Sequence, residues 1–158
     1  TKKKQTGTKT RWKPDLEVFT DIDIPLEYYL EVLKKQAVVN PNLTFTFYNE
    51  TKEGMELYEF CYPNGIVDYM KEKVGEGALN EVTYAEAERK GRDRADLDEY
   101  KLKMQFAFCF TNTAPMLEYY HNSSFLEHGG SPDKAVKSAF VSAIDAYARQ
   151  NNKYTKKS

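Results

Sequence analysis

The stretch Glu127-His-Gly-Gly-Ser-Pro-Asp-Lys-Ala-Val-Lys-Ser-Ala-Phe-Val-Ser-Ala-Ile-Asp-Ala-Tyr147 contains the clearest helix start in the chain. Ser131 predicts an N-cap because its hydroxyl can accept from an orphan backbone N–H, and Pro132 suits the first helical position. Apolar residues then recur at helical spacing, at Ala135, Val136, Ala139, Phe140, Ala143, Ile144 and Tyr147. We therefore expect a long helix whose apolar stripe packs against the rest of the fold.

The glycine pair before this helix, Gly129 and Gly130, supports two interpretations. Backbone N–H groups at a helix N-terminus can bind a phosphate, and His128 beside them could carry a proton or donate to an anion. The other interpretation is a structural turn. The sequence matches neither a Walker-type phosphate loop nor the dinucleotide fingerprint, and this favours the structural turn.

The length of the chain is that of one domain of ordinary size. The chain has 158 residues and a formal net charge of −1, so no global field favours a nucleic-acid or membrane partner. No apolar stretch approaches the roughly eighteen residues of a membrane span, and no signal-peptide pattern is present. We expect a cytoplasmic protein without a membrane partner. Because the sequence begins at Thr1 rather than methionine, we also expect a piece excised from a longer chain.

The two cysteines also fit a cytoplasmic protein. Cys61 and Cys109 each lie within an aromatic, strand-like run, where a small buried thiol is the usual occupant. The sequence therefore favours two reduced, structural cysteines over a disulfide.

The remaining elements follow from period-two and helical patterns. Asp23 with Pro25, and Asn64, predict two further helix starts. The predicted order is strand 8–13, helix 25–39, hairpin strands 43–49 and 55–62, helix 65–74, strands 79–87, 100–110 and 116–124, and the long helix. This order predicts an α+β fold in which the sheet packs on the long C-terminal helix.

The strand predicted over residues 100–110 has a strongly apolar face. An aromatic face of this kind can stack nucleic-acid bases, or it can form the core of the domain. The core is favoured because the long helix needs an apolar sheet to rest on. The residues on this face are Leu102, Met104, Phe106, Phe108 and Phe110.

The charged loop predicted over residues 88–96 also has two interpretations. Its basic residues could contact phosphates, or the loop could be a solvated connection. Glu88, Asp93 and Asp96 dilute the positive field and favour the solvated connection.

No pattern in the sequence identifies an active site. The two histidines, His121 and His128, and the two cysteines do not stand at metal-ligand spacing, so no metal site is expected. No nucleophile elbow is present, and Ser123 and Ser124 have no neighbouring general base other than His121. The residues alone predict a folded domain with no catalytic residues.

Three segments, taken in order, carry a family resemblance. The first is Gly7-Thr8 with residues 12–19, Trp-Lys-Pro-Asp-Leu-Glu-Val-Phe, and the second is residues 62–70, Tyr-Pro-Asn-Gly-Ile-Val-Asp-Tyr-Met. The third is Asn122 followed by Gly129, Gly130 and the long helix. Together they resemble the second, or transducer, domain of the ATPase component of bacterial type II DNA topoisomerases, the family of DNA gyrase B and topoisomerase IV B.

The chain also departs from that family. The family's Gly-Gly-Thr-His becomes Gly129-Gly130-Ser131-Pro132, residues 33–40 lack the family's arginine, and residues 75–99 match poorly. The resemblance is therefore to a divergent paralogue of gyrase B.

The resemblance implies a left-handed βαβ fold shared with a ribosomal protein domain, with residues 1–158 as a single transducer-like domain. In the family, ATP and Mg²⁺ bind in a preceding GHKL-type ATPase domain, and a final strand and a Gln-Thr-Lys loop follow the long helix. This chain contains neither, so it is expected to be a fragment that holds no cofactor and does not hydrolyse ATP alone. The parent enzyme would relay ATP-driven dimer closure through this domain to the DNA-cleaving core.

The resemblance implies partners as well. These are double-stranded DNA, the rest of the gyrase-B-like chain and the partner gyrase-A-like chain, in a homodimer of the former within a heterotetramer. Paired transducer domains would surround the transported duplex. The candidate DNA contacts, chosen by charge and expected exposure, are Arg89, Lys90, Arg92, Arg94, Lys101, Lys103, Lys134 and Lys137, and the family motif turn is Asn122, Gly129 and Gly130.

Two other functions use the same fold. One is a stand-alone nucleic-acid or ribosome-associated binding domain, because fold does not fix function. The other is a piece of a small metabolic kinase, which the absence of a Gly-rich phosphate loop disfavours.

Overall fold

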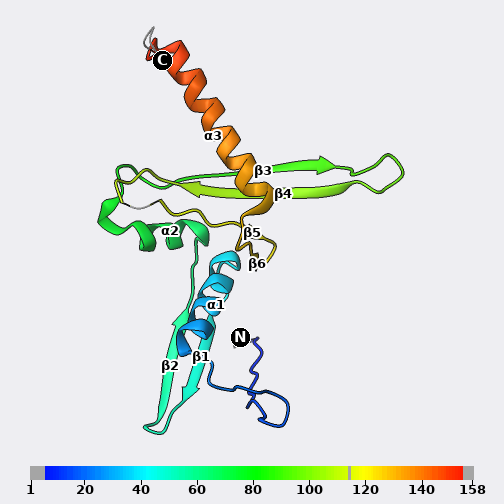
Figure 1. The fold of residues 1–158 in the computed structure, drawn as a ribbon, viewed down its shortest axis with the longest axis vertical. Coiled ribbons are helices and arrows are strands. Elements are labelled where there is room, and N and C mark those ends of the chain that lie inside the picture. Colours follow the sequence, from blue (N-terminus) through cyan, green and yellow to red (C-terminus); the bar gives the residue numbers. More distant parts are fainter. Residues whose placement is uncertain (1–5, 114, 155–158) are drawn as a thin grey trace, which may run out of the picture.

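The computed structural model describes residues 6–113 and 115–154. Within these residues the strands pair as three separate antiparallel hairpins rather than one sheet (Figure 1). The elements are α1 (Leu26–Val39), β1 (Phe45–Glu50), β2 (Met55–Phe60), α2 (Ile66–Val74), a short 3-10 turn (Gly75–Gly77), β3 (Thr83–Gly91), β4 (Tyr100–Phe108), β5 (Tyr120–His121), β6 (Ser124–Phe125) and α3 (Gly130–Gln150). The predicted α+β class is confirmed.

The β1–β2 hairpin packs against α1. Its register places Phe45 opposite Phe60 and Phe47 opposite Tyr58, so these side chains share one face. Phe47 stacks on Tyr29 of α1, with the two ring centroids 5.4 Å apart. The hairpin predicted from the alternating aromatic residues is confirmed.

The buried core lies at the C-terminal end of α1. Ala37 and Val38 are fully buried there, and Tyr62 and Tyr69 pack against them. Tyr69 comes from α2, so this small core joins the hairpin unit to the second helix. Cys61, beside it in the chain, is exposed, and the expectation of a buried thiol at this position is wrong.

The start of α2 differs in detail from the predicted N-cap. The N-cap position is Gly65, and Asn64 does not cap the helix with its side chain. Instead the backbone N–H and the side-chain amide of Asn64 both donate to Asp68, at 2.8 and 3.0 Å. The carboxylate one turn into the helix thus reaches back to the residue before it, as in a capping box.

The β3–β4 hairpin lies beside α2 where β3 begins and β4 ends, and its tip extends away from both α1 and α2 (Figure 1). Its strands pair over nine residues each, from Thr83 opposite Phe108 to Gly91 opposite Tyr100. Strand β3 runs to Gly91, so residues 88–91 of the segment 88–96, predicted to be a loop, belong to a strand. Leu102, Met104 and Phe106 remain 43–45% exposed, and the prediction that this face of β4 is core is therefore wrong.

The long helix α3 is where the prediction of packing fails. It begins at Gly130, with Gly129 at the N-cap position and no side-chain cap, so Ser131 is not the N-cap. None of its residues, all within the described range, is buried. Phe140 packs edge-to-face on Phe108, with ring centroids 5.2 Å apart, and beyond this point the helix extends away from the hairpin (Figure 1). The sheet does not pack along the helix as expected.

Two predicted strands are replaced by other structure. Residues 8–13 are not a strand, and the segment contacts the β1–β2 hairpin through side chains, with Lys9 over the Tyr48 ring and Arg11 paired with Glu50 at 2.9 Å. The strand predicted over residues 116–124 is shortened to the two-residue strands β5 and β6, because the chain turns back on itself at Asn122.

The buried end of α1 allows a matched test of the core. Replacing Val38, which is 1% exposed, by alanine removes two buried carbon atoms and leaves a cavity, so we expect a loss of about 2–3 kcal/mol in the free energy of unfolding. Val32→Ala makes the same change at a position on α1 that is 43% exposed, and should cost less than about 1 kcal/mol. Urea unfolding of both variants measures the difference, and equal losses would contradict this description of the core.

Candidate functional site

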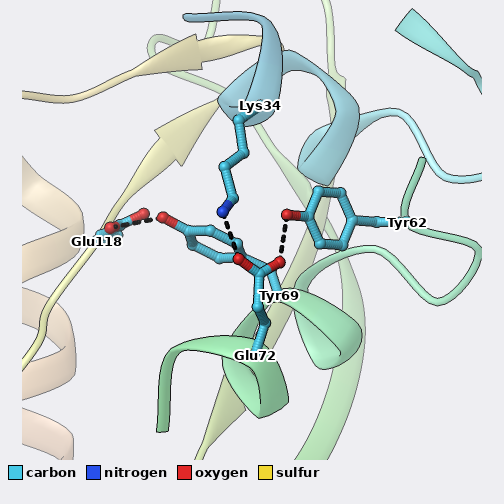
Figure 2. Close-up of polar contacts among 5 residues, drawn as sticks. All are labelled: Lys34, Tyr62, Tyr69, Glu72 and Glu118. Carbon is cyan, nitrogen blue, oxygen red and sulfur yellow. Dashed lines mark hydrogen bonds and ion pairs between the residues drawn. The ribbon is translucent and has the colours of Figure 1, made fainter. Parts of the chain in front are cut away.

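Two carboxylates and three tyrosines meet where α1, α2 and the segment before β5 come together. We call this group, with Lys34, the tyrosine–carboxylate cluster; its members are Lys34, Tyr62, Tyr69, Glu72, Glu118 and Tyr120. Figure 2 shows five of them, with Glu72 between Lys34 and Tyr62 and Tyr69 directed toward Glu118. The cluster joins parts of the chain that are far apart in sequence.

Glu72 forms the first half of the cluster. Its carboxylate pairs with the Lys34 ammonium of α1 and accepts a hydrogen bond of 2.5 Å from the Tyr62 hydroxyl (Figure 2). Because Glu72 lies on α2, these contacts fix α2 relative to α1 and to the end of the β1–β2 hairpin. Charge-assisted hydrogen bonds of this kind are stronger than those between neutral groups.

Glu118 forms the second half. One of its oxygens accepts from the Tyr69 hydroxyl of α2 at 3.1 Å, and the other accepts from the Tyr120 hydroxyl at 2.7 Å. Tyr69 and Glu118 are 49 positions apart, and the whole β3–β4 hairpin lies between them in sequence. Glu118 therefore ties α2 to the segment before β5 and to Tyr120 of β5.

The cluster changes the acidity of its members. Burial, helped by the hydrogen bond to the carboxylate, raises the pKa of Tyr62 and of Tyr120. Burial and the negative charge of Glu118 raise the pKa of Tyr69. Burial alone would raise the pKa of Glu72, but hydrogen bonds from Lys34 and Tyr62 outweigh it, and the pKa of Glu72 is lowered. The cluster thus favours neutral phenols next to an ionised Glu72.

Two further contacts tie α1 to the β5–β6 hairpin. The side-chain amide of Gln36 donates to the Ser123 carbonyl at 2.8 Å, and the Lys35 ammonium lies 3.7 Å from the centre of the Phe125 ring. A cation over an aromatic face at this distance is attracted by the ring quadrupole. The β5–β6 hairpin is therefore held from both α1 and α2.

The family motif residues lie in two turns: Asn122 between β5 and β6, and Gly129 and Gly130 where the chain enters α3. Asn122 has φ 53° in the β5–β6 turn, and Gly129 and Gly130 have φ 68° and 62°. A Cβ on Gly129 would lie 2.7 Å from the Asp133 Cβ, so this buried position requires glycine for space as well as for conformation. This geometry supports the structural turn and gives no separate support to an anion site.

The predicted DNA contacts on the β3–β4 hairpin are mostly paired with carboxylates. Lys101 pairs with Glu88 at 3.2 Å and Lys103 with Glu86 at 3.4 Å. These four side chains alternate with the apolar residues of both strands, so they form a charged face opposite the apolar one. The other pairs of predicted contacts are Lys90–Glu99, Arg92–Glu99, Arg94–Asp96 and Lys137–Asp133.

The structure separates the remaining candidates. Arg89 lies opposite Leu102, on the apolar face of the hairpin, where it donates to the Glu88 carbonyl at 3.0 Å. Lys134 is exposed in the first turns of α3, close in sequence to Lys137. The eight basic residues therefore do not form one continuous patch. They lie on the charged hairpin face, the hairpin tip, the apolar face and the root of α3.

Sequence reasoning does not find the tyrosine–carboxylate cluster. Periodicity places Tyr69 only on the apolar face of its helix, and it gives no reason to select Glu72 or Glu118. The available signal is the Glu118-Tyr119-Tyr120 run, since a carboxylate beside tyrosines in a strand-like segment can accept from phenols. Within the described residues no three histidine, cysteine or acidic side chains gather as metal ligands, and no helix is long and apolar enough to span a membrane.

Comparison with known proteins gives a consistent result. A family model described as DNA gyrase B matches residues 65–158. The DNA gyrase B protein of Bacillus mycoides is 27% identical over 154 residues, covering 94% of this chain and 35% of the relative. The DNA topoisomerase 4 B protein of Bacillus subtilis is 29% identical over 154 residues, covering 94% and 21%, and the DNA gyrase B protein of Thermotoga maritima is 24% identical over 147 residues, covering 92% and 23%.

These matches place the chain among the DNA gyrase B and DNA topoisomerase 4 B proteins. The chain belongs to the DNA gyrase B family, whose model matches more than half of its residues. The family resemblance drawn from the sequence is therefore confirmed. The chain spans between 21% and 35% of the length of the three relatives named.

The raised tyrosine pKa values predict how stability depends on alkaline pH. A phenol whose pKa is higher in the folded chain stabilises it below the unfolded value of about 10, and this contribution is lost as pH rises above that value. Tyr120→Phe should lower the free energy of unfolding near pH 8 by about 1–2 kcal/mol and make its fall between about pH 8 and pH 11 shallower. Urea unfolding at several pH values measures both effects.

Tyr28→Phe is the matched control for this test, because Tyr28 is 63% exposed on α1. It should leave both the stability and its pH dependence unchanged. A Tyr120→Phe variant with the parent's pH dependence would contradict the role of this phenol in the cluster.

Proposed function

We propose that this chain is the transducer module of the gyrase-B-like component of an ATP-dependent type II DNA topoisomerase, a cytoplasmic enzyme. Residues 1–158 form one transducer-like unit of the left-handed βαβ fold, whose final strand and Gln-Thr-Lys loop follow in a longer parent chain. The module is not catalytic. ATP and Mg²⁺ bind in the preceding GHKL domain of the parent, and this module relays the resulting dimer closure to the DNA-cleaving core.

The observation that carries the proposal is the Glu118 link in a chain of the DNA gyrase B family. A relay needs a rigid path from one end of the module to the other. Here Tyr69 and Tyr120 join α2 to β5 through Glu118, and Gln36 joins α1 to the β5–β6 turn. The chain then passes through the Gly129 turn into α3. Displacement of the α1–α2 unit would thus be transmitted to the root of the long helix.

The module also lines the cavity for the transported duplex in this proposal. The partners are double-stranded DNA, the rest of the parent chain and the gyrase-A-like chain, with the parent as a homodimer within a heterotetramer. Phosphate contacts need only exposed positive groups, and they carry no sequence preference. Ion pairs with carboxylates already offset the charge of most basic residues on the β3–β4 hairpin. We therefore favour Lys134, at the root of α3, as the residue that contacts a DNA phosphate.

The gene context tests the domain assignment directly. The proposal predicts a GHKL ATPase motif set upstream of this segment, and a Gln-Thr-Lys loop and a metal-binding cleavage domain downstream. An open reading frame limited to this segment would remove the ATPase and contradict the relay.

Weakening the Glu118 link should uncouple ATP hydrolysis from strand passage in the parent enzyme. In the full-length parent protein, Glu118→Gln weakens both phenol contacts but leaves the nucleotide site untouched. We expect the ATPase rate to stay within about twofold while ATP-dependent strand passage falls about tenfold, within the usual range of coupling free energies. Both rates are measured on the same preparation. Glu76→Gln, an exposed carboxylate after α2, is the control and should change neither rate. Parallel loss of both activities, or of neither, would contradict the relay.

Replacing Lys134 should change the salt dependence of duplex binding. Lys134→Gln removes one positive charge near the duplex, so the slope of log K against log salt should decrease by about 0.9, without a change in sequence preference. Fluorescence anisotropy of a labelled duplex across a salt series measures the slope. Lys52→Gln, in the turn of the β1–β2 hairpin far from α3 (Figure 1), is the matched control. An unchanged slope for Lys134→Gln would exclude this contact.

A further inference from the structure

The turn that leads into α2 contains the only asparagine–glycine pair of the sequence, Asn64 and Gly65. The Gly65 amide nitrogen donates to the Tyr62 carbonyl at 3.0 Å, and Pro63 takes the second position of this turn, as is favoured in β-turns. Asn64 is exposed, whereas Gly65 is buried. An asparagine before a glycine is chemically labile, because glycine has no Cβ to keep its backbone nitrogen away from the asparagine side chain.

The fold requires glycine at position 65. Its φ is 54°, in the left-handed region that side chains disfavour. A Cβ there would also lie 3.0 Å from the Pro41 Cγ and 3.1 Å from the Val38 carbonyl oxygen. Any other residue would therefore strain both the backbone and the packing between the end of α1 and the start of α2. The labile pair is thus a consequence of how closely the two helices approach each other.

We propose that Asn64 is a site of spontaneous deamidation, which the native fold holds in an unreactive state through Asp68. In the reaction the Gly65 nitrogen attacks the Cγ of Asn64 and forms an N–C bond. The bond from Cγ to the side-chain nitrogen breaks, and ammonia leaves with the Gly65 proton. Water then opens the cyclic imide at either carbonyl and yields aspartate or isoaspartate. This proposal does not depend on the proposed function.

Hydrogen bonds occupy both reacting groups in the folded chain. The Asn64 side-chain nitrogen donates to both oxygens of Asp68, at 3.0 and 3.1 Å, and the Asn64 backbone N–H donates to the same carboxylate at 2.8 Å. The Gly65 N–H is occupied by the Tyr62 carbonyl. Attack needs a Gly65 nitrogen released from that carbonyl and an Asn64 side chain free to rotate toward it. The reaction therefore requires local opening of the turn, and these hydrogen bonds set how often it opens.

Deamidation would reverse the contact between Asn64 and Asp68. Hydrogen bonds from the backbone and the side chain of Asn64 lower the pKa of Asp68, so its carboxylate is ionised at neutral pH. The product has a second carboxylate at position 64, which cannot donate a hydrogen bond to Asp68 and repels it. The first turn of α2 is weakened as a result. Because α2 carries Tyr69 and Glu72, the tyrosine–carboxylate cluster loses part of its anchor.

Peptide mapping by mass spectrometry tests the site. The intact protein is incubated at neutral pH, either folded or unfolded in guanidinium chloride, and the mass increase that accompanies loss of the amide nitrogen is followed at Asn64. We expect the reaction to be at least about tenfold slower in the folded protein, because opening must first break hydrogen bonds to a charged acceptor. Asn122, which precedes a serine, is the internal reference and should react more slowly than Asn64 in the unfolded protein.

Removing the acceptor tests the role of Asp68. In the folded protein, Asp68→Ala frees the Asn64 side chain and should speed deamidation by about tenfold. Tyr120→Phe is the matched control, because it lowers the overall stability through a hydrogen bond that does not involve Asn64. It should change the rate much less than Asp68→Ala does. Equal acceleration by the two variants would show that deamidation follows global unfolding, and would overturn the role of Asp68.

Variants that carry the charge of the product provide a second measurement, which does not depend on the folding of Asp68→Ala. Asn64→Asp should raise the equilibrium constant for unfolding by about fivefold, the value of one ordinary hydrogen bond. Adding Asp68→Asn restores a donor opposite the new carboxylate and should recover most of this loss. Urea unfolding measures both variants. Equal deamidation rates in the folded and unfolded protein, or an Asn64→Asp variant as stable as the parent, would overturn the proposal.

Discussion

The arrangement of this chain depends on the hydrogen bonds that Glu118 accepts. Without them, α1, α2 and the β1–β2 hairpin would form one small unit, and β5, β6 and α3 would be joined to it mainly through Gln36 and Lys35. Tyr69 and Tyr120 approach the same carboxylate from different elements. A half-buried carboxylate that accepts from two phenols is well satisfied, and losing either phenol removes one of the two hydrogen bonds that offset its burial. Together with the Gly129 turn and the contact of Phe140 with Phe108, this residue sets the position of the long helix relative to the core.

Local elements could be predicted from the sequence because their causes are local. The α1 helix, the β1–β2 hairpin and β4 follow from the periodicity of their apolar residues, and the structure confirms them within a few residues. The start of α3 differs from the prediction because Gly129, with its left-handed backbone, takes the N-cap position expected for Ser131. Residues 8–13 alternate as a strand does, but a strand also needs a backbone neighbour, and no pattern within six residues can supply one.

Packing could not be predicted in the same way. Two apolar surfaces in one sequence, such as those of β4 and α3, suggest that they meet, but the path of the chain between them decides whether they do. The candidate site shows the same limit. Charge alone selects the basic residues, and the carboxylates that pair with Lys101 and Lys103 become evident only from the strand register. The Glu118 link joins positions 49 residues apart, and such a contact leaves no local signal.

The division of the strands into three hairpins has a consequence for how the chain acquires its structure. Each hairpin pairs strands that follow one another directly, so the strand pairings close short loops, and local contacts of this kind form fast. We expect β1–β2 and β3–β4 to form early and independently, each on the microsecond timescale of hairpin formation. The slow step would then be the closure between Tyr69 and Glu118, which must bring together the two sides of a 49-residue separation. During synthesis on the ribosome, the unit containing α1 and α2 would be in place before its Glu118 partner emerges.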